Sequence, residues 1–179
     1  MNPALRYSFI YGGLAAVVLA MFIAVIGLLQ DRVAWVATMT FGLSVMLVAM
    51  SFVFVGVKRY RDVESGGVIR FRRALGVGLL IALIAAIAYV LMWEVYLALT
   101  DYRFMNDYIA RLIRDAQASG KSAFEIATLT AELEPYREMY ANPLLRLPMT
   151  FSEIAPVGVL VAIVSAALLR NPRLLPART

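Results

Sequence analysis

One carboxylate, Glu94, lies within a long apolar stretch of this sequence. A charge at the centre of a membrane costs about 2.5 to 3.5 kcal/mol on insertion scales, so an acid in such a stretch is a candidate site for a proton or ligand. Glu94 lies about two helical turns before the stretch ends near Thr100, where water or Arg103 could also reach it. We therefore expect Glu94 either to make structural hydrogen bonds or to bind a proton or ligand.

A second polar group precedes the last apolar stretch. Thr150 and Glu153 have the spacing of a capping box, in which a hydroxyl and a carboxylate satisfy free backbone N–H groups at a helix start. Pro156 would then lie in or near the first turn, where its missing N–H donor costs little. The three residues predict a helix start, and the alternative is a reactive or gating corner.

Basic residues crowd segment 58–73, around a glycine pair that permits a tight reversal of the chain. The glycine spacing does not match that of nucleotide-binding loops. The cations either anchor the segment on the cytoplasmic side of a membrane, or bind an anionic lipid headgroup or a cytoplasmic protein. The residues concerned are Lys58, Arg59, Arg61, Gly66, Gly67, Arg70, Arg72 and Arg73.

The chain contains neither cysteine nor histidine. Thiolate nucleophiles, disulfides, Cys/His zinc sites and imidazole-based triads are therefore excluded. The acidic residues are scattered, so we assign no catalytic, cofactor-binding or metal-binding residue and expect no cofactor. We do not expect the protein to be an enzyme, although enzymes that use neither cysteine nor histidine are not excluded.

Apolar stretches must position these residues. A composition of 62% hydrophobic and 16% charged residues does not fit a soluble domain of this size. Each stretch is long enough to cross a hydrocarbon core of about 30 Å as a helix. We predict an all-α integral membrane protein, one membrane domain over residues 1–179, with four transmembrane helices at about 7–29, 33–57, 74–100 and 151–170. The first is expected to be a retained helix, joined to the second by Gln30–Arg32.

Lys and Arg are concentrated in segment 58–73, near the N-terminus and in the tail after residue 169. The positive-inside rule predicts that these parts, and both termini, are cytoplasmic in a bacterial inner membrane, with loop 101–150 periplasmic. Topology and attraction to anionic headgroups then explain the net charge of +5, so no nucleic-acid partner is expected.

Small residues at four-residue spacing predict close helix contacts, either within one chain or between chains. The second stretch lacks such a line and carries Met39, Met46 and Met50, so we expect it to face lipid or a partner. The three lines are Gly12, Ala16, Ala20 and Ala24; Ala74, Gly78, Ala82 and Ala86; and Gly158, Ala162 and Ala166.

The long loop 101–150 shows helical periodicity. An amphipathic helix is predicted over 101–119 and ends at Gly120. Ser122 and Glu125 form a capping box that opens a second helix, which Pro135 should kink or end and whose apolar side includes Phe124 and Tyr136. This helical hairpin is expected to lie on the outer surface, where it either shields helix ends or docks another periplasmic component.

Several segments resemble the bacterial membrane family called domain of unknown function 4199. They are Gly56–Asp62, Gly66–Phe71, Met149–Gly158 and Leu168–Arg170, with a long outer helical loop between the last two spans. The resemblance covers nearly the whole chain and implies four spans in a bacterial inner membrane. It brings no activity, cofactor or site.

Three functions stay open. We expect a structural or accessory membrane protein that self-associates or binds a membrane partner. The first alternative is an oligomeric small-molecule or ion transporter or channel subunit, which would use Glu94. The second is a lipid-handling protein.

Overall fold

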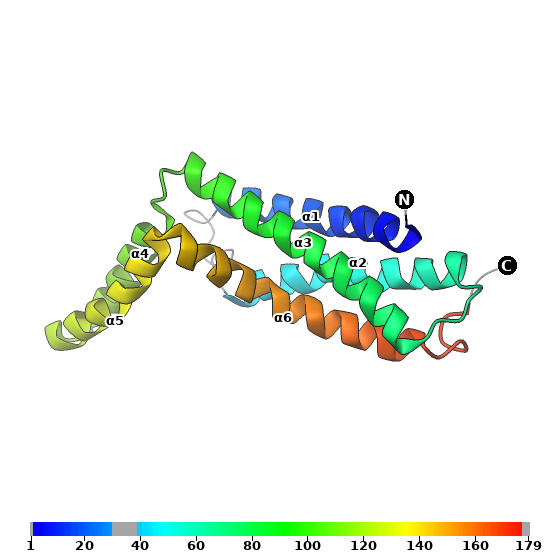
Figure 1. Cartoon of the computed structure of the whole chain (residues 1–179). Coiled ribbons are helices and arrows are strands. Elements are labelled where there is room, and N and C mark those ends of the chain that lie inside the picture. Colours follow the sequence, from blue (N-terminus) through cyan, green and yellow to red (C-terminus); the bar gives the residue numbers. More distant parts are fainter. Residues whose placement is uncertain (1, 30–38, 177–179) are drawn as a thin grey trace. The chain divides into compact units, whose positions relative to one another are not determined.

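The computed structural model describes residues 2–29 and 39–176, and this part of the chain contains six α-helices and no strand (Figure 1). The helices are α1 (Pro3–Leu29), α2 (Met39–Glu64), α3 (Phe71–Leu99), α4 (Phe104–Ala118), α5 (Ala123–Ala141) and α6 (Pro143–Leu169). The all-α class is therefore confirmed. The predicted connection Gln30–Arg32 lies outside the described residues.

Four of these helices are long and apolar enough to cross a membrane. They are α1, α2 from Thr40 onward, α3 and α6, with 25 to 29 residues each. Only 28% to 39% of the most apolar window of each helix is buried within the molecule. Large exposed apolar surfaces are rare on soluble proteins, so these helices indicate a protein embedded in a membrane.

The chain divides into two compact units. The first, called the bundle unit, comprises the described residues up to Met92 and those from Phe151 onward. The second, called the hairpin unit, is Trp93–Thr150. Helices α3 and α6 each contribute residues to both units.

Glycine allows the helices of the bundle unit to approach closely. A Cβ atom added to Gly158 of α6 would lie 2.9 Å from the Cβ of Ala82 on α3, and one added to Gly78 would lie 3.1 Å from the Cβ of Ala162. Backbone approach of this kind gives dispersion contacts that lipid cannot replace. The predicted small-residue lines of α3 and α6 therefore meet each other within one chain.

Within the chain, the predicted line on α1 is fully buried only at its start. Gly12 is buried against Ile84 and Ile81, but Ala24 is exposed. The buried side of α1 continues instead through larger residues, among them Leu19 and Ile23. Small size alone therefore does not identify which side of a helix is buried.

Helix α2 has an exposed side, which includes Leu47 and Val48, but the described methionines are not on it. The side chain of Met39 lies outside the described residues. Met46 and Met50 of α2 are buried, with 6% and 0% of their surfaces exposed. The sulfur of Met50 would lie 3.5 Å from a Cβ on Gly158, so this flexible side chain fills space that the glycine leaves. Gly56 of α2 also allows close packing, because a Cβ there would lie 2.6 Å from a methyl carbon of Ile81 on α3.

The helix start predicted at Thr150 and Glu153 is wrong, because α6 begins at Pro143. The side-chain oxygen of Asn142 accepts a hydrogen bond from the backbone N–H of Leu144 at 3.0 Å, which is an N-cap contact. Proline suits the first helical position, since its missing N–H would be unpaired there anyway. Pro156 therefore lies well inside the helix rather than in its first turn.

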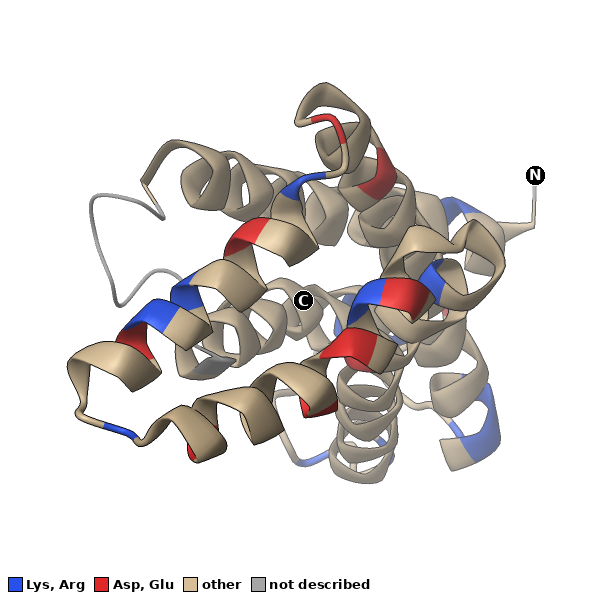
Figure 2. Ribbon diagram, turned by 90° about the vertical axis from the view of Figure 1, so that its left-hand side faces the viewer, with Lys and Arg blue, Asp and Glu red and all other residues tan. Residues whose placement is uncertain are grey.

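The hairpin unit contains the two helices predicted in the long loop. Gly120, with φ of +77°, follows α4, and the capping box between Ser122 and Glu125 opens α5. Helix α5 continues through Pro135 to Ala141. Charged residues of both signs lie along α4 and α5 (Figure 2).

The residues of the apolar side predicted for α5 differ in burial. Phe124 and Tyr136 are 81% and 50% exposed, whereas Tyr140 is buried. On the facing helix α4, Ile109 is buried, with 1% of its surface exposed.

Candidate functional site

Glu94, on the last turns of α3, forms an ion pair with Arg146 near the start of α6. Arg146 Nε donates to one carboxylate oxygen of Glu94 and Nη2 donates to the other, both at 2.7 Å. The Arg146 side chain is 3% exposed and that of Glu94 is 22% exposed. This two-point geometry is the strongest that arginine forms with a carboxylate, and both residues lie within the hairpin unit.

The third nitrogen of the guanidinium is also paired. Arg146 Nη1 donates to the backbone carbonyl of Tyr140 at 2.7 Å. Above and beside the guanidinium lie the rings of Tyr102, with its centroid at 4.9 Å, and Tyr140, at 5.9 Å. Cation–π attraction adds to the hydrogen bonds when the cation is shielded from water.

Further aromatic contacts hold Tyr140. Its hydroxyl accepts a hydrogen bond from Trp93 Nε1 at 2.5 Å. Phe104 of α4 packs edge-on against Trp93, with ring centroids 4.9 Å apart. The Glu94–Arg146 pair and these rings form a cluster that we call the arginine cage, made up of Trp93, Glu94, Tyr102, Phe104, Tyr140 and Arg146.

A left-handed turn positions Tyr102. Asp101 and Tyr102 have φ of 51° and 54°, a region that residues other than glycine rarely adopt. The N–H of Tyr102 donates to the carbonyl of Leu97 at 2.8 Å. This hydrogen bond, which joins residues five positions apart, is typical of the Schellman motif at a helix end. The end of α3 is thereby closed, and the chain turns so that Tyr102 reaches Arg146.

The junction between α5 and α6 positions Arg146. Asn142 ends α5 and caps α6, so it alone separates the two helices. Tyr140 is therefore followed after six positions by Arg146, and the carbonyl of one accepts from the guanidinium of the other. The short junction at Asn142 thus brings Tyr140 and Arg146 of the arginine cage together.

The arginine cage shows what Glu94 contacts, and both roles predicted for this residue stay predictions. Both carboxylate oxygens accept hydrogen bonds from Arg146, which supports the structural role. Arg103, the partner considered from the sequence, lies instead 3.7 Å from Asp101 and donates to the carbonyl of Thr100. Arg146 was missed because it is 52 residues from Glu94 and stands among ordinary loop cations.

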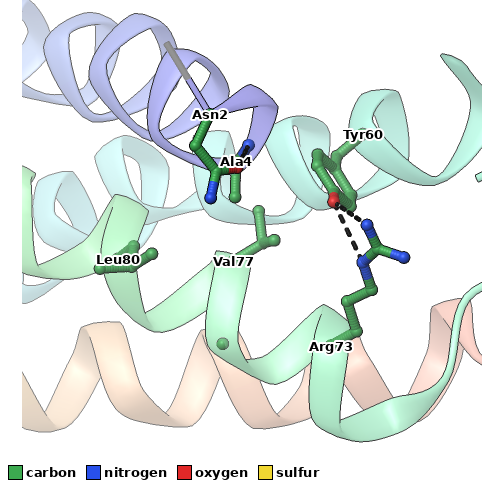
Figure 3. A pocket seen from close by; sticks show the side chains of 7 residues that line it. Asn2, Ala4, Tyr60, Arg73, Val77 and Leu80 are labelled. Carbon is green, nitrogen blue, oxygen red and sulfur yellow. Dashed lines mark hydrogen bonds between the residues drawn. The ribbon is translucent and has the colours of Figure 1, made fainter. Parts of the chain in front are cut away.

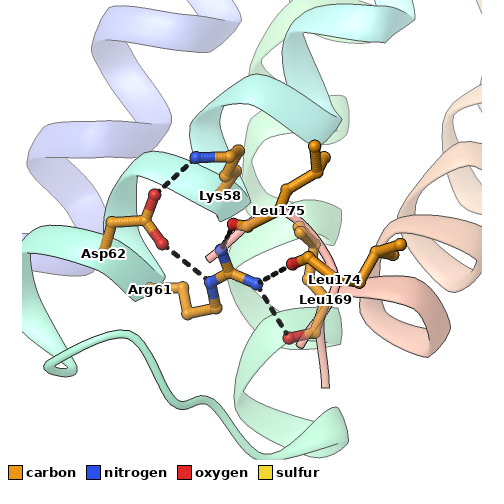
Figure 4. A network of polar contacts seen from close by, with 6 residues as sticks. All are labelled: Lys58, Arg61, Asp62, Leu169, Leu174 and Leu175. Atoms are coloured by element: carbon orange, nitrogen blue, oxygen red, sulfur yellow. Dashed lines mark hydrogen bonds and ion pairs between the residues drawn. The ribbon is translucent and has the colours of Figure 1, made fainter. Parts of the chain in front are cut away.

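The basic segment contains a second buried arginine. Arg61, on α2 in the bundle unit, has a fully buried side chain that is paired with Asp62 at 2.8 Å. Its Nη1 donates to the carbonyl of Leu174 at 3.0 Å, and its Nη2 donates to that of Leu175 (Figure 4). A longer contact of 3.5 Å reaches the carbonyl of Leu169, the last residue of α6. Arg61 therefore satisfies carbonyls at and beyond a helix end.

The other residues of the segment fall into three groups. Lys58 pairs with Asp62 at 2.6 Å, and Arg73 donates to the Tyr60 hydroxyl. Gly66 and Gly67 have positive φ, as expected for a reversal. Three arginines are exposed and have no charged partner in the described part of the chain, namely Arg59, Arg70 and Arg72.

The three residues of the predicted corner differ in burial. Thr150 is buried and belongs to the hairpin unit, whereas Glu153 and Pro156 are exposed and belong to the bundle unit. All three lie inside α6. In residues 2–29 and 39–176, no group of three or more acidic side chains is placed to hold a metal ion.

Comparison with known proteins gives one match. The model of a family described as "Protein of unknown function (DUF4199)" matches residues 7–171. No curated protein and no solved structure matches the chain.

Proposed function

The chain belongs to the DUF4199 family of proteins of unknown function, and from this premise we propose that it is a structural or accessory protein of a bacterial inner membrane. In this role it assembles with itself or with another membrane protein. The observation that carries the proposal is the two-point pairing of Glu94 with Arg146. Because Arg146 binds both carboxylate oxygens of Glu94, this pairing supports a role of the acid in holding the fold together.

We propose that both termini and the basic segment 58–73 are cytoplasmic. Contacts at one end of the bundle unit support this proposal. Asn2 of α1 and Arg73 of α3 line the same pocket, and Arg61 of α2 binds carbonyls that follow α6. Three exposed arginines, Arg59, Arg70 and Arg72, belong to the same part of the chain. The positive-inside rule favours a cytoplasmic location for this end.

The hairpin unit supplies a surface for assembly. Phe124, at the start of α5, is 81% exposed, and Leu144 of α6 is 80% exposed. Aromatic side chains with such exposure are frequent anchors in protein–protein contacts. We propose that the hairpin unit lies on the periplasmic side and meets its partner there.

Cysteine cross-linking in native membranes tests this assembly. Because the natural chain has no cysteine, Phe124→Cys introduces the only thiol, and Glu132→Cys on the same helix is the matched control. Mild oxidation should convert Phe124→Cys into a disulfide-linked species of defined mass at several times the yield of the control.

Equal cross-linking of the two variants would indicate random collision and contradict assembly through this surface. A bifunctional thiol–amine reagent distinguishes the two forms of assembly. A product of twice the chain mass indicates self-association, whereas another defined mass indicates a second protein.

A further inference from the structure

A pocket lies between the first turns of α1 and α3, over α2 (Figure 3). Its volume is about 460 Å³, and all of its residues belong to the bundle unit. Arg73 and Gly76 are exposed, so the pocket opens to the outside of this unit. The lining residues are Asn2, Ala4, Tyr60, Arg73, Gly76, Val77 and Leu80.

One end of the pocket is polar and cationic. Arg73 donates to the Tyr60 hydroxyl from Nε at 3.0 Å and from Nη2 at 2.7 Å. Tyr60 is itself fixed, because it is 2% exposed and its ring packs edge-on against that of Tyr7. The phenol orients the guanidinium without neutralising it, and the remaining N–H groups of Arg73 are available to an anion.

Asn2 adds a donor across the pocket from Arg73 (Figure 3). Its side-chain oxygen accepts a hydrogen bond from the N–H of Ala4 at 3.0 Å, which caps α1. This contact fixes the amide group and leaves its NH₂ available for a ligand. The labelled side chains of Asn2 and Arg73 lie on opposite sides of the pocket in Figure 3.

The other end of the pocket is apolar. Gly76, Val77 and Leu80 continue from Arg73 along one side of α3, facing Ala4 of α1. No atom lies within 4 Å of where a Cβ on Gly76 would be, so the glycine leaves open space beside these residues. From Arg73 to Leu80 is about 10 Å along a helix, the length of several methylene groups.

The change from a cationic end to an apolar end of the pocket matches an amphiphile with an anionic head. Arg70 and Arg72 are exposed near the start of α3 and lack charged partners in the part of the chain that the structure describes. Such cations concentrate anionic lipids near a membrane surface. The geometry points to a binding site for one anionic phospholipid, with its phosphate on Arg73 and Asn2 and an acyl chain along Val77 and Leu80.

Native mass spectrometry of the detergent-solubilised protein tests this site. The probes are dioleoyl phosphatidylglycerol and, with the same chains, dioleoyl phosphatidylcholine. Wild-type protein should retain one phosphatidylglycerol in preference to phosphatidylcholine. Arg73→Gln should weaken phosphatidylglycerol binding about tenfold, because a charged hydrogen bond to the phosphate is lost. Arg72→Gln, which removes a neighbouring exposed charge, should change binding by less than about twofold.

Filling the apolar end provides an independent test. Gly76→Leu should occupy the open space and weaken binding of both lipids about tenfold or more. Gly13→Leu on α1 is the matched control, because a Cβ there also meets no atom within 4 Å and Gly13 does not line the pocket. Thermal unfolding of each variant verifies that the bundle unit still folds.

Two results would overturn the site. Equal losses for Arg73→Gln and Arg72→Gln would mean that a diffuse basic surface attracts the lipid. Displacement of the lipid by an equal concentration of glycerol phosphate, with unchanged binding in Gly76→Leu, would mean that the pocket takes a soluble phosphate and not a membrane lipid.

Discussion

At the scale of single residues, the described part of the chain buries two arginines and gives each a different set of partners. Arg146 is matched by one carboxylate, one carbonyl and two aromatic rings. Arg61 is matched by Asp62 and by backbone carbonyls. Guanidinium is suited to both environments because it presents five N–H donors in a fixed plane. In each case the burial of the charge is compensated by several acceptors.

Removing one partner of the Glu94–Arg146 pair should destabilise the protein strongly. Glu94→Gln and Arg146→Gln should each lower the free energy of unfolding by about 3 kcal/mol, because each leaves the other group buried without its counter-charge. The double variant should lose less than the sum of the two, by about 1 to 3 kcal/mol. Denaturant unfolding in detergent micelles measures this coupling.

The exposed pair Arg137–Glu134 is the control in the same unit. Its nitrogen–oxygen distance is 2.8 Å, and its side chains are 40% and 47% exposed. Glu134→Gln should change the free energy of unfolding by less than about 0.5 kcal/mol. If Glu94→Gln is as stable as wild type and instead abolishes proton or cation flux in liposomes, the structural role of Glu94 is refuted.

For Glu94, the sequence predicts the unusual position of the residue but not its partner. Its unusual position can be read from the sequence, because the apolar stretch around it is continuous. Its partner cannot, since the pairing depends on a turn at Asp101 and Tyr102 and on the junction at Asn142. The sequence therefore predicts two alternative roles for Glu94, and the tertiary structure adds the partner that makes the structural role testable.

At the scale of helices, local signals determine most boundaries. The hairpin of α4 and α5 was predictable because Gly120, Ser122 and Glu125 act on neighbouring backbone groups. The start of α6 was predicted wrongly because two sets of start signals compete. Asn142 and Pro143 come first and are followed by apolar residues, so the helix forms before Thr150 is reached.

The capping box at α5 should make the first turn of this helix sensitive to acid. Hydrogen bonds from the side chain and backbone of Ser122 lower the pKa of Glu125 from its usual value of 4.5. A lowered pKa in the folded state means that the stabilisation is complete above the usual value and is lost as the pH falls through the folded one. The first turn should therefore loosen in the acidic range below about pH 4.5.

Amide hydrogen exchange across α5, corrected for intrinsic rates between pH 3 and 7, measures this loosening. Glu125→Gln keeps an acceptor without a titrating group, so its protection should vary less with pH than that of the wild type. Ser122→Ala should lose about 1 kcal/mol of protection in the first turn. Identical pH profiles for wild type and Glu125→Gln would contradict the assignment.

At the scale of the whole molecule, the lengths of four helices and their exposed apolar surfaces carry the membrane assignment. Composition predicted this property, because no folding of a chain with 62% hydrophobic residues can hide them all. The pocket beside Arg73 was not predictable, since it combines residues from α1, α2 and α3. The basic residues of segment 58–73 indicated the positive charge beside the pocket, but the sequence did not indicate the shape of the pocket.

Thiol labelling tests the proposed topology. Val68, between α2 and α3, is 59% exposed, and Ser119, between α4 and α5, is also exposed. With no natural cysteine in the chain, Val68→Cys and Ser119→Cys each carry a single thiol. A membrane-impermeant maleimide should label Ser119→Cys from the periplasm of spheroplasts, and should label Val68→Cys only after lysis. Labelling of both variants from one side would contradict a crossing by α3.

The burial of Arg61 has a consequence for the order of biosynthesis. Its carbonyl partners are translated 108 to 114 residues after it. Because the ribosome delivers the chain N-terminus first, α2 emerges with a cation that has Asp62 beside it but whose carbonyl acceptors do not yet exist. The nascent bundle unit therefore stays incomplete at Arg61 until α6 and the segment after it have been made. Synthesis of Leu174 and Leu175 then completes the hydrogen bonds of a helix that left the ribosome much earlier.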